Sequence, residues 1–131
     1  MTTTDTADLF TAFEARSMDD RSFSHREHMM VAWEMLHRHD FTDAVARYGA
    51  GIRAMAATAG APEKYNATIT VAFLSLVAER IHAGSHDSFD AFAAANPDLM
   101  RKEAVTRFYS DARLNSPMAR AGFMLPDRVG A

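Results

Sequence analysis

Two histidines one helical turn apart are the residues of this sequence best placed for chemistry. His25 and His28 follow Ser24, which together with Glu27 forms the pattern of a helix capping box. With Ser24 as the N-cap, the helix phase is fixed, and both imidazoles fall beside an apolar stripe that contains Met29. The macrodipole at a helix start disfavours the imidazolium, so we expect a neutral His25, the form that binds a metal or acts as a base.

A second group of polar residues opens the most apolar segment of the chain. Asn66 and Thr70 are four residues apart on one face of a helix expected over residues 66–83, and Tyr65 precedes them. Buried amides and hydroxyls need partners, and we expect these side chains to share one cavity with the two histidines. Two helix N-termini would meet there, so an anionic substrate or a metal-bound oxyanion would fit.

These residues define a set of predicted roles. The predicted catalytic groups are His25, His28 and Tyr65, the metal ligands are His25, His28 and Asn66, and the substrate contacts are Asn66, Thr70 and Trp33. Two imidazoles with oxygen donors suit Fe(II), Mn(II), Zn(II) or Cu(II). Structural alternatives stay open: an exposed imidazole for His25, a hydrogen-bonded core residue for His28, an N-cap for Asn66 and a bond back to its own helix for Thr70.

Two Glu-x-x-His pairs have the spacing found in di-iron helical bundles: Glu34 with His37, and Glu79 with His82. Ligands of a metal in a bundle core must project inward. At about 100° per residue, both pairs fall opposite the apolar faces of their helices. We therefore expect both pairs to lie on solvated faces and to bind no metal.

The rest of the sequence predicts helices and no convincing pair of strands. Helices are expected over about residues 5–18, 25–38, 42–58, 66–83 and 88–95, and from an Asn96 cap to about residue 109. Residues 110–131 are expected to be irregular, with one turn from Ser116 to Gly122 and an apolar segment that docks on the bundle. The 131 residues thus predict one all-α domain, a bundle of four to six helices with an irregular C-terminal tail.

Composition excludes several classes of protein. The net charge of −3 lacks the basic footprint of a nucleic-acid binder, and the absence of cysteine excludes disulfides and Cys-based zinc or iron–sulfur sites. No apolar stretch approaches the roughly 20 residues of a membrane span, and the first residues do not resemble a signal peptide, so we expect a cytoplasmic protein. No P-loop or Rossmann fingerprint is present, so no nucleotide cofactor is expected.

Three stretches carry a family resemblance. Phe23–Trp33 reads F-x-H-x-x-H-x-x-x-A-W, Lys64–Thr70 reads K-Y-x-x-T-x-T, and Ser116–Arg120 is followed by Pro126 and Asp127. Together they resemble a family of small, mostly uncharacterised bacterial helical proteins. The resemblance implies a histidine at the position of Asn66, so a three-His site in that family would be reduced here to two imidazoles and an amide. It implies no settled activity.

Three hypotheses follow. The first is a metal-dependent enzyme that acts on a small polar metabolite in a buried His-lined pocket. The second is a metal-free protein that binds a small molecule in the same pocket. The third is a helical interaction module that forms a homodimer, because 48% of the chain is hydrophobic and Gly49, Ala50, Gly51 and Ala54 would let another helix approach closely.

Overall fold

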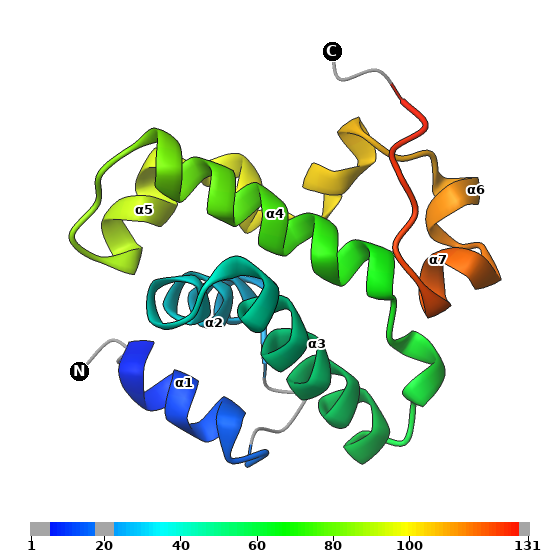
Figure 1. The fold of residues 1–131 in the computed structure, drawn as a ribbon, viewed down its shortest axis with the longest axis horizontal. Helices are drawn as coiled ribbons and strands as arrows, with labels where there is room; N and C mark the ends of the chain where they lie inside the picture. The colour runs from blue at the N-terminus through cyan, green and yellow to red at the C-terminus, as the bar shows by residue number, and fades with distance from the viewer. Residues whose placement is uncertain (1–5, 18–22, 129–131) are drawn as a thin grey trace.

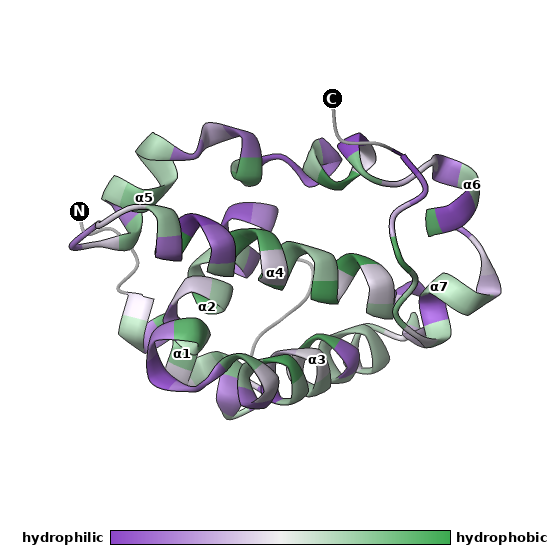
Figure 2. Ribbon diagram, turned by 45° about the horizontal axis from the view of Figure 1, so that its top comes forward, coloured by the Kyte–Doolittle hydropathy of each residue, from purple (hydrophilic) through white to green (hydrophobic). Residues whose placement is uncertain are grey.

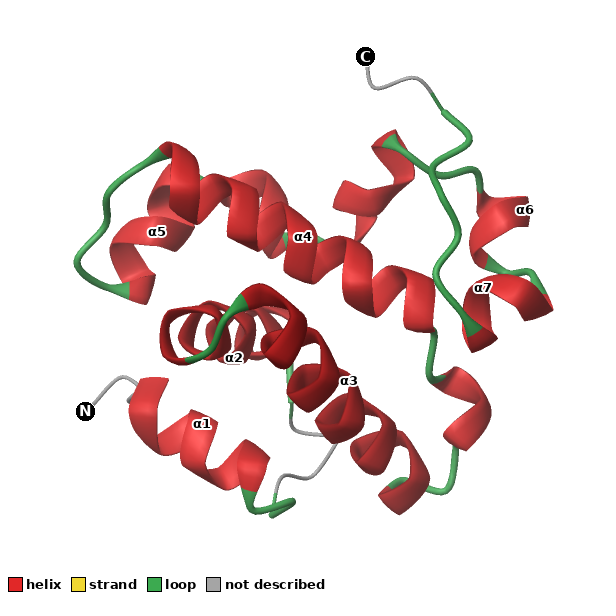
Figure 3. Ribbon diagram, in the orientation of Figure 1, coloured by secondary structure: helices red, strands yellow, loops and turns green. Residues whose placement is uncertain are grey.

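The longer helices begin where a short polar side chain can cap them. Each cap accepts a hydrogen bond from the backbone N–H three residues later, and these caps are Ser24, Asp40, Asn66 and Ser88. The computed structural model describes residues 6–17 and 23–128, and over these ranges it is helical with no strand, as the sequence predicts (Figure 3). The α-helices are α1 (Thr6–Glu14), α2 (His25–Arg38), α3 (Phe41–Thr58), α4 (Ala67–Ala83), α5 (Phe89–Ala95), α6 (Asp111–Leu114) and α7 (Pro117–Ala121).

Helix α2 is the centre of the packing. It contacts α1, α3 and α4, and α4 crosses the other side of the bundle toward α7 (Figure 1). The predicted inward faces are confirmed: Met29 and Met35 on α2, and Leu74 and Val77 on α4, are at most 1% exposed. Hydrophobic and hydrophilic residues alternate along the long helices, as expected of helices that bury one face (Figure 2).

The segment after Asn96 differs from the single helix predicted there. It forms two 3₁₀ helices, Pro97–Met100 and Lys102–Arg107, separated by one extended residue. Asn96 makes no side-chain cap bond, because its Oδ1 accepts a hydrogen bond from Arg80 at 2.8 Å. The prediction was wrong because the Asn96 side chain, which the local pattern assigned to a helix cap, bonds instead to a residue that is distant in the sequence.

The C-terminal tail is more ordered than predicted. Helix α7 covers the expected turn and ends before Gly122, and α6 is an additional short helix. The Thr68 hydroxyl donates to the carbonyl of Gly122 at 2.6 Å and accepts from the N–H of Met124 at 3.0 Å. Backbone groups thus dock the tail on α4, whereas the apolar side chains of Phe123 and Leu125 are 47% and 72% exposed.

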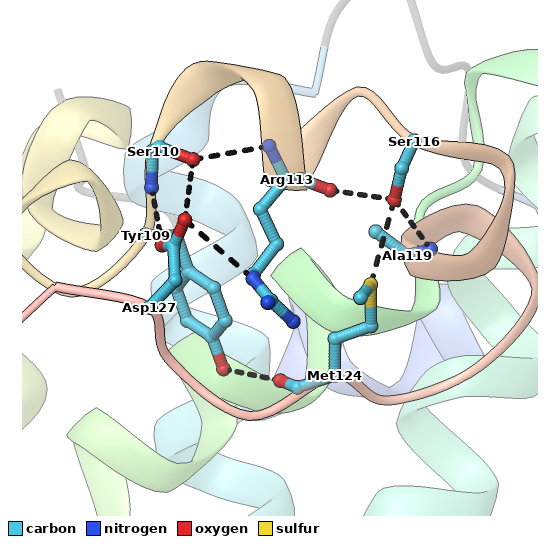
Figure 4. A network of polar contacts seen from close by, with 7 residues as sticks. All are labelled: Tyr109, Ser110, Arg113, Ser116, Ala119, Met124 and Asp127. Carbon is cyan, nitrogen blue, oxygen red and sulfur yellow. Dashed lines mark hydrogen bonds and ion pairs between the residues drawn. The ribbon is translucent and has the colours of Figure 1, made fainter.

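A second polar network closes the tail into a loop (Figure 4). The carboxylate of Asp127 accepts hydrogen bonds from the hydroxyl and N–H of Ser110 at 2.6 and 2.7 Å, and it lies 3.5 Å from Nε of Arg113. The hydroxyl of Ser110 holds the pKa of Asp127 below its usual value. The Tyr109 hydroxyl donates to the carbonyl of Met124 at 2.8 Å.

The first helix is shorter than predicted. Helix α1 ends at Glu14, and the predicted end at Met18 lies outside the described residues. Within the described ranges, no helix combines the length and the apolar character that a membrane crossing needs.

The glycines of α3 serve contacts within the chain. A Cβ on Gly51 would lie 2.2 Å from the ring of Phe13, so the missing side chain lets that ring lie against α3. A Cβ on Gly49 would lie 3.3 Å from the hydroxyl of Tyr65. These glycines therefore no longer argue for a homodimer, which stays a prediction from the sequence.

We expect Gly51→Ala to lower the free energy of unfolding by at least about 1 kcal/mol, measured by urea denaturation. A Cβ 2.2 Å from a ring that is only 1% exposed puts the cost of overpacking in the upper part of its range of about 1–3 kcal/mol, which exceeds the gain in helix propensity of about 1 kcal/mol. Gly49→Ala is the matched control on the same helix. It faces only the tip of a half-buried Tyr65, and it should be neutral or stabilising. Equal destabilisation of both variants would contradict this account of α3.

Candidate functional site

One cavity brings together five of the predicted site residues. It has a volume of about 490 Å³ and lies among α2, α3, α4 and the 3₁₀ helix Pro62–Lys64. This volume is in the range of small-molecule sites, roughly 300–1,000 Å³. The predicted residues that line it are His25, His28, Tyr65, Asn66 and Thr70.

Trp33, the sixth predicted site residue, does not line this cavity. Its ring lies 4.1 Å from the ring of His37 and 6.3 Å from that of Phe89, centroid to centroid, and it borders a separate cavity of about 200 Å³. The predicted substrate contact is therefore wrong for the cavity of the two histidines. Trp33 lies eight residues beyond His25, which places it about 12 Å farther along the helix axis.

His25 is held in one orientation by the segment after α5. Its Nε2 lies 2.9 Å from the carbonyl oxygen of Leu99. A carbonyl only accepts, so Nε2 carries the proton and Nδ1 of the neutral ring is left as an acceptor. The ring packs edge-on against Phe73, with centroids 4.8 Å apart.

The charge state of His25 follows from its burial. Burial lowers the pKa of His25 below its usual 6.5, outweighing the bond to Leu99 and the charge of Glu103, which both raise it. The charge of Lys102 lowers it further. The ring is thus neutral at pH 7, as the sequence predicts, although burial rather than the helix macrodipole is the main cause.

His28 lies deeper in the wall of the cavity. Its ring is 4.5 Å from the ring of Phe23, and its Nε2 is shielded from solvent. Its backbone carbonyl accepts a hydrogen bond from the hydroxyl of Tyr48 at 3.1 Å. Burial raises the pKa of Tyr48, so this phenol stays neutral. Tyr48 also lines the cavity. The sequence analysis missed this role because the residue fits the apolar spacing of α3.

Asn66 and Thr70 adopt the structural roles that the sequence left open. The Asn66 amide accepts from the N–H of Ile69 at 2.9 Å and donates to the carbonyl of Leu114 at 2.7 Å. The Thr70 hydroxyl donates to the carbonyl of Asn66 in its own helix at 2.8 Å. Both residues still line the cavity, where each side-chain oxygen retains capacity to accept at least one further hydrogen bond.

The donor set for a metal consists of the two imidazoles. Among the described residues, no three His, Cys, Asp or Glu side chains are placed to share an ion. The oxygen of Asn66 already accepts a backbone hydrogen bond, which makes it a weak third ligand. In the Glu-x-x-His pairs, His37, Glu79 and His82 are exposed, as expected of solvated faces, whereas the Glu34 side chain is only 17% exposed and lies 2.7 Å from Arg38 in an ion pair.

Two lysines in the cavity wall were missed by the sequence analysis. Lys64 and Lys102 are the only lysines of the chain, and both line the cavity. Lys64 stands in the K-Y-x-x-T-x-T stretch, so a local signal for it was present. Lys102 reaches the cavity only through the fold of the segment after Asn96, which local patterns do not report.

Comparisons with known proteins return no match to any family model, curated protein or solved structure. The resemblance carried by residues 23–33 and 64–70 therefore stays a prediction.

Because the pKa of His25 is lower in the folded state, the unfolded chain binds a proton at mildly acidic pH while the folded protein does not. We expect the free energy of unfolding to fall as the pH drops from neutral through 6.5 toward the folded-state pKa. His25→Gln keeps an N–H donor for Leu99 but does not titrate. In this variant, the free energy of unfolding measured by urea denaturation should change less steeply with pH than in the wild type, by up to about 1.4 kcal/mol per pH unit.

The control for this prediction is His82→Gln, which removes an exposed histidine from α4. It should keep the wild-type pH dependence. A His25→Gln slope equal to that of the wild type would show that burial does not lower the pKa of His25.

Proposed function

We propose that the chain binds a small organic molecule in the cavity between α2 and α4, and that His25 acts on it as an acid–base group. The observation that carries the proposal is the neutral imidazole in the cavity wall, oriented by the Leu99 carbonyl. A perturbed pKa beside a cavity is a common signature of a functional group. Of the hypotheses from the sequence, this one is closest to metal-free small-molecule binding.

The orientation of the ring supports a base rather than an acid in the resting protein. With its proton on Nε2 held by Leu99, His25 has Nδ1 available to take a proton from a bound molecule. The Leu99 carbonyl would then stabilise the imidazolium. The Tyr65 hydroxyl makes no hydrogen bond with any described residue and can donate to a ligand in the cavity it lines.

The test blocks the cavity without disturbing the core. Ala61 is half-buried and lines the cavity from the loop after α3, outside the core, and Ala59 is exposed outside the cavity. We expect small fragments that bind the wild type in ligand-observed NMR to bind Ala59→Trp equally and to lose binding by at least about tenfold in Ala61→Trp. Fragments that bind all three proteins alike, or none that bind the wild type, would overturn the proposal.

A metal centre is the second candidate, favoured by one observation. Histidines that bind metals usually donate their other ring N–H to a carbonyl or carboxylate, as His25 does to Leu99. His25 and His28 would then hold an iron, manganese, zinc or copper ion with oxygen ligands from a bound molecule or water. The metal would supply Lewis-acid polarisation of that molecule.

Metal analysis of the purified protein by mass spectrometry separates the two candidates. Because the donor set is short, we expect well under one equivalent of iron, manganese, zinc or copper in the wild type, and no difference from His25→Ala. Stoichiometric metal that is lost in His25→Ala and retained in His82→Ala would replace the metal-free proposal with the metal-dependent one.

A further inference from the structure

The charges in the cavity wall are one-sided. The chain has 17 acidic residues against 14 lysines and arginines, yet both of its lysines line the cavity and, among the residues the structure describes, no carboxylate does. Lys64 comes from the segment before α4 and Lys102 from the segment after α5, so two distant parts of the chain bring positive charge to one place. Glu103 acts on His25 electrostatically without lining the cavity.

The remaining wall is largely apolar. Side chains of Met29, Ile52, Ile69 and Phe73 line the cavity from α2, α3 and α4. Contact between such a wall and an apolar surface makes the free energy of binding more favourable, whereas a ligand that is polar throughout benefits little. The cavity therefore combines an apolar interior with two lysines in its wall.

A third cation lies beside the same wall. The guanidinium of Arg53 lies 4.8 Å from the ring centre of Tyr65, in a cation–π contact that keeps it next to a cavity-lining side chain. Neutral His25 adds no charge of its own that would already satisfy an anion. The field in the cavity thus favours negative charge in a ligand.

We infer that the ligand is an organic anion, a carboxylate on an apolar body, whose head is held by Lys64 and Lys102. The inference rests on the proposed function, because it names the class of molecule that the cavity binds. A carboxylate suits the site better than a polyanion, since two lysines are point charges rather than bidentate arginine forks. The apolar walls would cover the body of the ligand.

The test compares three probes that share one chain length: octanoate, octanamide and octylammonium. We expect isothermal titration calorimetry to show octanoate binding at least about tenfold more tightly than octanamide, and octylammonium more weakly than either. Lys64→Gln/Lys102→Gln should lose about tenfold in octanoate affinity and leave octanamide affinity unchanged, since each part-exposed ion pair contributes up to about fivefold. Both lysines are exposed, so the variant should fold, which circular dichroism checks.

The charge-matched control is Arg47→Gln/Arg107→Gln, which removes two exposed cations that do not line the cavity. It should bind octanoate like the wild type. Octanamide or octylammonium binding as tightly as octanoate, with loss in Ala61→Trp, would overturn the anion inference and keep the proposed function. Octanoate binding that is unchanged in the double lysine variant would also overturn the inference. Fragments that bind none of the proteins would overturn both proposals.

Discussion

The buried amide of Asn66 is the interaction on which the arrangement of the site depends. Its oxygen caps α4 through Ile69, and its nitrogen reaches the carbonyl of Leu114 in α6, 48 residues away. An amide at 9% exposure needs both partners, since a buried polar group left unsatisfied costs about 1–3 kcal/mol. One side chain therefore decides where α4 begins and where the tail returns to it. Tyr65 and Thr70 take their places in the cavity from that start.

Local signals in the sequence were sufficient for the longer helices and for half of the site. Ser24 and Asn66 are residue types that cap helices, and they mark the starts of α2 and α4 in the sequence. Once the start of a helix is known, the helical repeat shows which residues share its buried face. That is why His25 and Thr70 could be placed toward one cavity from different helices. Trp33 shares this side of α2 with Met29 but lies two helical turns beyond His25, so the repeat alone could not show that it misses the cavity.

The other half of the site depends on contacts between distant segments, which local sequence patterns do not reveal. The sequence after Asn96 has a cap residue and a proline at the first helical position. The Asn96 side chain nevertheless does not cap a helix, because its oxygen accepts a hydrogen bond from Arg80 of α4. Lys102 could not be assigned to the cavity without knowing this fold. The position of the tail depends on a distant contact in the same way. In the sequence Thr68 is an ordinary helix residue, and it anchors the tail only through its hydrogen bond to the carbonyl of Gly122.

The helix that does not form after Asn96 is a condition for the site. In a continuous α-helix the carbonyl of Leu99 would accept the N–H of the residue four positions later. The extended backbone at Arg101 interrupts that ladder, and the same carbonyl accepts the N–H of His25 instead. A regular helix would therefore compete for the acceptor that sets the tautomer of the imidazole.

Helix α4 holds both flanks of the cavity, one at each end. Near its start, Asn66 and Thr68 fix the tail; near its end, Arg80 binds Asp98 through two hydrogen bonds of 2.7 and 3.0 Å and holds the pKa of that carboxyl below its usual value. The side chains of this pair are 31% and 41% exposed, so the pair contributes at most about 1 kcal/mol to stability. Its planar, two-point geometry matters more, because Asp98 adjoins Leu99. The orientation of His25 thus depends on an ion pair whose own effect on stability is small.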